Sequence, residues 1–321
     1  MNHYPIIKLR RGKDEAVKRY HPWIFSGAIE TAAPNLQAGD LVTVVDYKNE
    51  ILGTGFAEAG NIAVKLLAFD NTKIDSLFWK ERLEKAFELR KMMGLVDNQH
   101  TNCYRLVHSE GDNLPGLIID IYGKTAVVQA QTEGMALNIK SISDALLNID
   151  GLDINSVYNK SSEAMQRMGK DAVDDGYLFG EKSDDYVLEN DSKFLIDWEE
   201  GQKTGFFLDQ RNNRDLVRKL AKGKNVLNTF CYTGGFSVTA LRGGANKVVS
   251  VDCSKKAITA CEKNVALNGF DVVENPSVTE DAKLFLQNMN QGEFDLIILD
   301  PPAFAKNHKS SLMSGYTHMQ R

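Results

Sequence analysis

The sequence predicts an α/β protein with a β-rich N-terminal part, a small mixed central part and a C-terminal parallel sheet. Short apolar runs between turn residues fill residues 1–70, and strands with one long helical repeat follow over 71–190. From about residue 195, short apolar strands alternate with helices, as in a doubly wound parallel sheet. We therefore predict three domains, at residues 1–70, 71–190 and 191–321.

The composition is that of an ordinary globular protein, with 321 residues, 43% hydrophobic, and a net charge of −5. No apolar run is long enough to span a membrane, and the N-terminus lacks the apolar core of a secretion signal. The four cysteines form no CxxC motif and no cluster with histidine, which favours reduced thiols, no metal and a cytoplasmic location. They are Cys103, Cys231, Cys253 and Cys261.

The first two predicted domains show mixed patterns. Residues 39–58 predict a β-hairpin, residues 61–69 a third strand, and residues 72–94 a helix that stops at Gly94. Residues 105–131 predict two strands joined at Gly123. A helix over 134–148, a strand near 155–160 and a loop or short hairpin over 171–191 are expected next.

The third predicted domain has the clearest pattern. Helices are expected over 210–223, 234–244, 254–269 and 279–292, and strands over 225–230, 247–252 and 294–300. In such sheets the ligand lies beyond the carboxyl ends of the strands.

Three stretches at these strand ends carry candidate chemistry. Gly234 and Gly235 follow the first strand, where they allow close backbone approach to a ligand, although any tight βα turn would use them too. The spacing is neither GxGxxG nor a P-loop. Asp252 ends the next strand and is placed either to bind ribose hydroxyls or to cap a helix. Asp281 is placed either to cap its helix or to contact an adenine amino group.

The stretch "LIILDPPAF" ends the last predicted strand. Pro301 and Pro302 cannot continue a strand ladder, so they form a rigid corner between Asp300 and Phe304. An aromatic ring held there can stack on a nucleobase while the acid and the backbone carbonyls bind its polar edge. A plain strand-ending turn needs neither the acid nor the ring, so we favour a base-binding site.

The motifs "FCYTGGFS" (230–237), "VDCS" (251–254), "EDA" (280–282) and "DPPAF" (300–304) resemble those of class I S-adenosylmethionine (SAM) methyltransferases. With "HPWIFSGAI" (21–29), "RLVHSEGDNLPGLIIDIYG" (105–123) and "KTGFFLDQRNNR" (203–214), the whole chain resembles the bacterial 23S rRNA large-subunit cytosine-5 methyltransferase family. The resemblance implies an N-terminal PUA domain, a central α/β domain of EEHEE type and a Rossmann-like methyltransferase domain that is incomplete at its C-terminus.

The resemblance also implies roles for individual residues. The methionine-side loop of the SAM site would comprise Phe230, Thr233, Gly234 and Gly235. Asp252 would hold the ribose and Asp281 the adenine. Phe207, Gln210 and Arg211 would lie against the cofactor, with packing and surface charge as the alternatives for Phe207 and Arg211.

The implied partner is 23S rRNA, and the sequence leaves a homodimer open. The PUA resemblance assigns phosphate contacts to the basic stretch 8–19, which is otherwise a solvated face. Its assigned residues are Lys8, Arg10, Arg11 and Lys13. Trp23 is expected in the core rather than stacked on a base.

Carbon-5 methylation needs a thiolate that attacks carbon 6. None of the four cysteines fits, and the resemblance places the nucleophile beyond residue 321. The chain ends at "SGYTHMQR", where the helix after the last strand should begin, so we expect an unpaired sheet edge and little activity from residues 1–321 alone. Methylation of guanine N7 or an exocyclic amine, and RNA binding without catalysis, remain open. The missing glycine fingerprint disfavours an NAD-dependent dehydrogenase.

Overall fold

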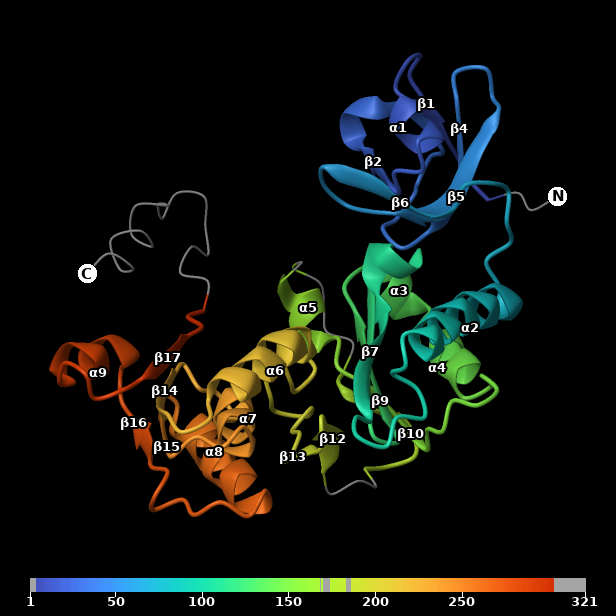
Figure 1. Ribbon diagram of the computed structural model, residues 1–321. Coiled ribbons are helices and arrows are strands. Elements are labelled where there is room, and N and C mark those ends of the chain that lie inside the picture. The colour runs from blue at the N-terminus through green and yellow to red at the C-terminus, as the bar shows by residue number, and fades with distance from the viewer. Residues whose placement is uncertain (1–3, 168, 170–173, 183–185, 303–321) are drawn as a thin grey trace. The chain divides into compact units, whose positions relative to one another are not determined.

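The structure, a computed structural model, describes residues 4–167, 169, 174–182 and 186–302. The chain forms two compact units (Figure 1). The first unit comprises residues 1–187 and 196–208, and the second unit comprises 188–195 and 209–321. The chain therefore passes from one unit to the other three times. The first unit includes nearly all of the two predicted N-terminal domains, and its division at residue 70 stays a prediction.

The N-terminal sheet of the first unit has six strands in the order β2-β6-β5-β4-β1-β3. The predicted hairpin and third strand are confirmed, whereas the short strands β1, β2 and β3 were missed, because β1 and β3 each contain a charged residue and β2 has only three residues. The strands are β1 (Ile6–Leu9), β2 (Trp23–Phe25), β3 (Ile29–Ala32), β4 (Leu41–Val45), β5 (Ile51–Ala57) and β6 (Ile62–Ala68), with α1 (Glu15–Lys18) and the 3-10 turn η1 (Ser26–Ala28) between them.

The central sheet of the first unit has the order β11-β10-β9-β8-β7. The predicted turn at Gly123, with φ of 59°, joins two antiparallel strands. The expectation of only two strands over 105–131 is wrong, because the 3-10 turn η2 (Ser109–Asp112) and Asn113, with φ of 56°, break the first into two. The strands are β7 (Cys103–His108), β8 (Leu117–Tyr122), β9 (Thr125–Ala130), β10 (Ser156–Asn159) and β11 (Gly176–Phe179).

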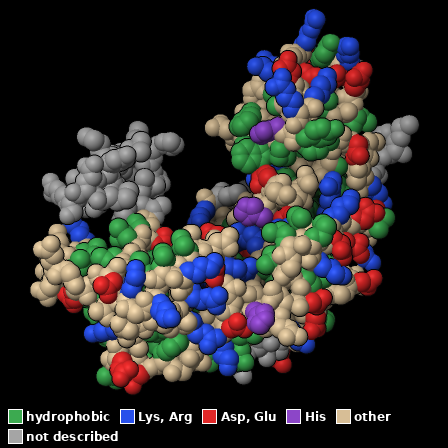
Figure 2. All heavy atoms as spheres, viewed as in Figure 1, with side chains coloured by type: hydrophobic (Ala, Val, Ile, Leu, Met, Phe, Trp, Pro, Cys, Tyr) green, Lys and Arg blue, Asp and Glu red, His purple; other side chains and the backbone are tan. Residues whose placement is uncertain are grey.

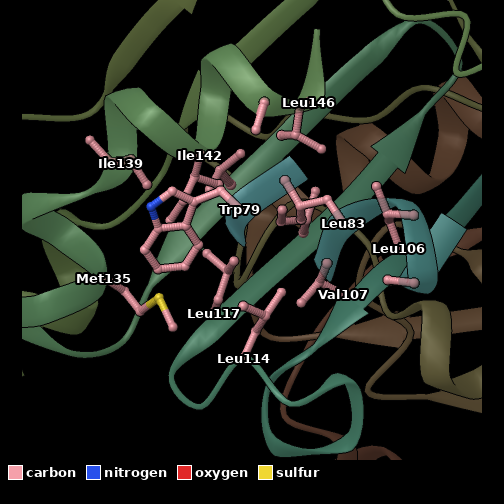
Figure 3. Close-up of a cluster of buried hydrophobic side chains, with 14 of the residues drawn as sticks. Trp79, Leu83, Leu106, Val107, Leu114, Leu117, Met135, Ile139, Ile142 and Leu146 are labelled. Atoms are coloured by element: carbon pink, nitrogen blue, oxygen red, sulfur yellow. The ribbon is translucent and has the colours of Figure 1, made fainter. Parts of the chain in front are cut away.

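Helices cover one face of the central sheet (Figure 1). The helix predicted over 72–94 is α2 (Ser76–Met92), which begins at Asp75, whose carboxylate caps two backbone N–H groups. The single helix predicted over 134–148 is wrong: Asn138 divides it into α3 (Glu133–Leu137) and α4 (Ile139–Leu146). A further helix, α5, spans Ser162–Arg167. Figure 3 shows the buried core between these helices and the sheet, around Trp79 and Leu83.

Residues 196–208, which we call the strap, contact the other face of the central sheet. Trp198 stacks on Tyr122 with 6.1 Å between ring centroids. The hydroxyl of Thr204 donates to Asp120 Oδ2 over 2.5 Å, and Arg105 donates two hydrogen bonds to the same buried carboxylate. The strap is therefore fixed to the sheet by ring stacking and by a buried charge.

The second unit contains a parallel sheet with the order β16-β15-β14-β17. Its strands are β14 (Asn225–Thr229), β15 (Lys247–Asp252), β16 (Ser277–Thr279) and β17 (Leu296–Leu299). Its helices are α6 (Arg211–Leu220), α7 (Gly235–Arg242), α8 (Lys255–Leu267) and α9 (Ala282–Asn288), preceded by the 3-10 turn η3 (Leu208–Gln210). All of the helices and strands predicted for this sheet are present, and its three-residue strand β16 was missed.

Side chains alternate between the two faces of this sheet, as a doubly wound fold requires. Leu227, Val249 and Val251 pack against Phe285 of α9. On the other face, Asn228 donates to Ser237 of α7 over 2.8 Å. Within the described residues, β17 forms one edge of the sheet.

A hairpin precedes this sheet in the chain and belongs to the same unit. It consists of β12 (Val187–Glu189) and β13 (Ser192–Phe194), joined by Asn190 and Asp191, whose φ values are 49° and 66°. Two left-handed residues of these types form the turn that suits a two-residue hairpin. No helix in the described part of the chain combines the length and apolarity needed to cross a membrane.

Candidate functional site

The predicted site residues of the second unit gather at one edge of its parallel sheet. Thr229 of β14 lies in register with Val251 of β15 and Leu299 of β17, so the three strands end side by side. The predicted residues at or just beyond these ends are Phe230, Asp252 and Asp300. The structure therefore brings together the three stretches that the sequence selected.

The loop after β14, residues 230–235, has an unusual backbone. Phe230, Tyr232 and Gly234 have φ values of 55°, 49° and 80°. For the two residues that carry a Cβ, this conformation costs free energy and persists only where the surroundings impose it. At Gly234 a Cβ would lie 2.5 Å from Cys261 Sγ, so both the dihedral and the space require glycine.

Helix α7 begins directly after this loop and has no side-chain cap at its N-terminus. Its N-cap residue, Gly234, has no side chain that could accept from the first N–H groups, those from Gly235 onwards. Such a helix start binds carboxylate or phosphate groups, because the free N–H groups and the helix dipole both favour negative charge.

Asp252 faces the same loop from the end of β15. Its Oδ2 accepts a hydrogen bond from Tyr232 N over 3.0 Å and its Oδ1 accepts from Ser254 N over 2.9 Å. The alternative that Asp252 caps the following helix is wrong, because Ser254 is the cap and accepts from Ala257 N. Each carboxylate oxygen keeps a second lone pair for a ligand hydroxyl.

Asp281 follows β16 and caps α9. Its carboxylate accepts from Lys283 N and Leu284 N over 2.9 and 3.1 Å. The capping role is thus confirmed, and the adenine contact stays a prediction. The backbone ties this segment to its neighbour, since Glu280 N donates to Asp252 O.

Asp300 lies beyond β17 in an exposed position and contacts a predicted site residue. Gln210 Nε2 donates to Asp300 Oδ2 over 3.2 Å, and Asn213 Nδ2 donates to Gln210 Oε1 over 2.6 Å. Gln210 was predicted to touch the cofactor, and the structure places its amide beside the acid of the predicted base site. Pro301 and Pro302 follow directly, whereas Phe304 lies outside the described residues.

Arg211 belongs to a buried charge cluster that the sequence did not reveal. Glu189 of the hairpin, with only 2% of its side chain exposed, accepts from Arg211 Nε over 3.3 Å and from Arg214 Nε over 2.5 Å. The alternative that Arg211 is merely a surface charge is therefore wrong. The cluster fixes the start of α6, and with it Gln210, to the hairpin.

Phe207 belongs to the strap of the first unit, where Lys203 Nζ lies 4.4 Å from its ring centroid. Its contact with a cofactor stays a prediction.

None of the four cysteines lies where its thiol could attack a base held beside Asp300. The hydrogen bond with Cys261 and burial raise the pKa of Cys231 far above its usual range, and Cys261 is fully buried beneath Gly234. Cys103 is buried in the first unit. Cys253 is exposed, but it follows Asp252 on the opposite side of β14 from β17.

The predicted RNA-binding residues lie on the N-terminal sheet and its first turn. Lys8 is half-buried in β1, while Arg10, Arg11 and Lys13 are exposed. Arg10 Nε donates to Ile29 O, and the guanidinium of Arg11 lies 5.6 Å from the ring centroid of Tyr47. Figure 2 shows lysine and arginine side chains mixed with acidic ones on this part of the molecule.

Trp23 was expected in the core, but the structure shows it half-buried in the edge strand β2. Its indole Nε1 donates to Glu110 Oε1 over 2.8 Å, and Lys65 Nζ lies 5.9 Å from its ring. The core expectation is therefore wrong, because β2 is an edge strand that leaves this side chain partly exposed.

Comparisons with known proteins agree with this architecture. A family model described as "S-adenosylmethionine-dependent methyltransferase" matches residues 162–321, and one described as "PUA-like domain" matches residues 7–69. The fold and the sheet-edge site thus define a SAM-dependent methyltransferase with an N-terminal PUA-like domain.

Proteins named "Ribosomal RNA large subunit methyltransferase I" are similar along nearly the whole chain. The one from Klebsiella pneumoniae is 36% identical over 97% of this chain and 78% of its own length. The one from Tolumonas auensis is 36% identical over 94% and 77%. The chain belongs to the ribosomal RNA large subunit methyltransferase I family.

Solved structures show the same fold. A Streptococcus mutans protein assigned as a SAM-dependent methyltransferase has a TM-score of 0.78 and 24% identity, covering 92% of this chain and 77% of that one. SMU.776, assigned as a methyltransferase and solved with S-adenosylhomocysteine (SAH), has a TM-score of 0.79 and 24% identity, covering 95% and 77%.

Proposed function

We propose that this protein methylates carbon 5 of a cytosine in 23S ribosomal RNA. The observation that carries the proposal is the alignment of three strand ends at one sheet edge. A loop suited to a methionine carboxylate, an acid suited to ribose hydroxyls and the Asp-Pro-Pro corner follow these three ends. Family membership supports large-subunit rRNA as the substrate. The cytosine and its carbon 5 are what the resemblance of the sequence motifs to the cytosine-5 methyltransferases implies.

The residues at the sheet edge fit SAM. The uncapped start of α7 and the loop Thr233–Gly235 suit its carboxylate, Asp252 suits the ribose hydroxyls, and Asp281 lies on the neighbouring segment for the adenine. When bound, SAM supplies an electrophilic methyl group. The protein's own contribution is to hold the target base beside Asp300, whose carboxylate is oriented by Gln210.

Carbon-5 chemistry requires a further group. A thiolate adds to carbon 6 of the ring, carbon 5 then takes the methyl group, and loss of the carbon-5 proton expels the thiolate. The burial and placement of the four cysteines of residues 1–321 assign this role to none of them. A second candidate is methylation of a guanine nitrogen, because the Asp-Pro-Pro corner also suits a base nitrogen, which has its own lone pair and needs no thiolate.

Incubation of the purified full-length protein, any residues after Arg321 included, with 23S rRNA transcript and isotope-labelled SAM, followed by nuclease digestion and mass spectrometry, separates the candidates. We expect labelled 5-methylcytidine, and RNA containing 5-fluorocytosine should trap the enzyme covalently, because fluorine blocks the final proton loss. Labelled guanosine without trapping would replace the carbon-5 assignment by the second candidate.

The cofactor site has its own test in calorimetry with SAH. Asp252→Ala should weaken binding about 10- to 100-fold, since hydrogen bonds to a charged group contribute about 1.5–3 kcal/mol. Asp271→Ala is the matched control, because Asp271 is an exposed acid that accepts from Val273 N and Glu274 N in another turn. A wild-type protein that does not bind SAH would refute the proposed site.

A further inference from the structure

Asn264 of α8 is a fully buried polar side chain that joins two segments of the second unit. Its Nδ2 donates to Thr233 O over 2.8 Å, and its Oδ1 accepts from Leu195 N, at the end of the hairpin, over 2.8 Å. Both ends of the amide are therefore used, one of them in the loop that precedes α7.

The contact with Thr233 fixes the orientation of one peptide group. The peptide between Thr233 and Gly234 directs its carbonyl to Asn264 and its N–H to Cys231 O, over 2.9 Å. Rotation of this peptide would break both hydrogen bonds. The same rotation would also redirect the backbone that leads into the first turn of α7.

The loop needs such restraints because its backbone is strained. Phe230 and Tyr232 have positive φ values, which residues with a Cβ rarely adopt. Hydrogen bonds with other elements oppose relaxation, and three of them join described residues. Two involve β15, namely Cys231 N to Val251 O and Tyr232 N to Asp252 Oδ2, and the third is the Asn264 contact. Only the third reaches the peptide directly before the two glycines.

We propose that Asn264 is a positioning residue for SAM binding, which holds the Thr233–Gly234 peptide in the orientation that presents the loop and the start of α7 to the cofactor. This inference rests on the proposed cofactor role of the loop. Asn264 acts through Thr233 and touches neither the cofactor nor the RNA.

Asn268, which directly follows α8 one helical turn after Asn264, provides a matched control. Its Nδ2 donates to Lys193 O and to the backbone carbonyl of Asn264, each over 2.8 Å, and its Oδ1 accepts from Lys193 N over 2.9 Å. It therefore holds the same hairpin as Asn264 does, but it makes no contact with the loop. The difference between equivalent variants at the two positions isolates the loop contact.

The experiment compares Asn264→Asp with Asn268→Asp. In each variant a carboxylate oxygen takes the place of the amide Nδ2 and faces a backbone carbonyl, that of Thr233 or of Lys193, instead of donating to it. The other oxygen still accepts from the backbone N–H of the hairpin segment. SAH affinity is measured by calorimetry, KM for SAM and for RNA by methyl transfer, and thermal stability by circular dichroism. We expect Asn264→Asp to raise the Kd for SAH and the KM for SAM at least tenfold and to leave the KM for RNA within twofold, whereas Asn268→Asp changes all three less than threefold.

Equal SAH affinities for the two variants, with wild-type protein binding SAH, would overturn the inference and leave the proposed function intact. Wild-type protein that fails to bind SAH would refute the proposed cofactor site instead. If either aspartate variant does not fold, the pair Asn264→Ala and Asn268→Ala is read by the same criteria, since alanine introduces no charge.

Discussion

The buried cluster of Glu189, Arg211 and Arg214 predicts a large loss of stability when its carboxylate is removed. Glu189 is 2% exposed and Arg214 is 3% exposed, with two hydrogen bonds of 2.5 and 2.8 Å between them. Removing one partner of a buried ion pair costs about 3–5 kcal/mol. Glu189→Gln keeps one acceptor oxygen, so we expect a value near the lower end, about 3 kcal/mol.

Urea unfolding followed by circular dichroism measures this loss. For a slope of about 2 kcal/mol/M, a loss of about 3 kcal/mol lowers the midpoint by roughly 1.5 M. Trp23, Trp79 and Trp198 are the three tryptophans of the chain, and all belong to the first unit. Tryptophan fluorescence therefore reports the unfolding of the first unit. We expect the lowered midpoint in the part of the circular dichroism transition that does not coincide with the fluorescence transition.

The control is Glu163→Gln, because Glu163 pairs with Arg167 at the exposed surface of α5. Exposed helical pairs contribute only about 0.3–0.5 kcal/mol. The reasoning is refuted if the two glutamine variants have the same midpoint within error, since burial would then make no difference to the ion pair.

Three further changes have defined outcomes. Gly234→Ala should lower the thermal stability of the second unit more than Gly269→Ala does. Both residues have a φ of 80°, but of the two only Gly234 has another atom close to the position of a Cβ, at 2.5 Å. Equal losses of stability would contradict the steric argument. Asp120→Asn should release the strap, because it weakens the buried ion pair with Arg105 and the hydrogen bond from Thr204. The rate of amide hydrogen exchange of residues 200–207 should then rise at least tenfold. An unchanged rate would show that the stacking of Trp198 on Tyr122 is sufficient to hold the strap. At Glu110, burial raises the pKa of the carboxyl, but hydrogen bonds from neighbouring groups outweigh it and hold the pKa below its usual value of 4.5. A carboxyl whose pKa is lower in the folded state than in the unfolded state stabilises the protein at a pH above its unfolded-state pKa, and this stabilisation is lost as the pH falls through its folded-state pKa. Wild-type protein should therefore lose more stability than Glu110→Gln between about pH 5 and pH 3. Equal losses of the two proteins in urea unfolding at these pH values would contradict this.

The sheet edge was predictable because its signals are local. Each candidate acid follows an apolar run, and parallel strands place their carboxyl ends together, so Asp252 and Asp300 could be assigned to one edge without coordinates. Gly234 was equally readable, since a buried strand, glycines and a helix follow one another within a few residues.

The supports of the site were not predictable, because they depend on contacts between distant segments. Glu189 lies 25 residues before Arg214, and Asn264 lies 69 residues after Leu195. Both contacts involve a hairpin whose two strands have three residues each, too few to show a periodic pattern. The ion pair of Arg211 was missed for the same reason, since its partner belongs to that hairpin, and the predicted cofactor contact of Arg211 stays a prediction.

The three passages of the chain between the units determine how the protein can be dissected. A fragment beginning at Asp209 would keep the acids at the strand ends but would lose the carboxylate that neutralises Arg214 and the backbone groups that both asparagines of α8 bind. A self-sufficient catalytic half must therefore begin at or before Leu188 and carry the strap as an internal loop. A single proteolytic cut at any one of the passages leaves the two halves joined by the other two.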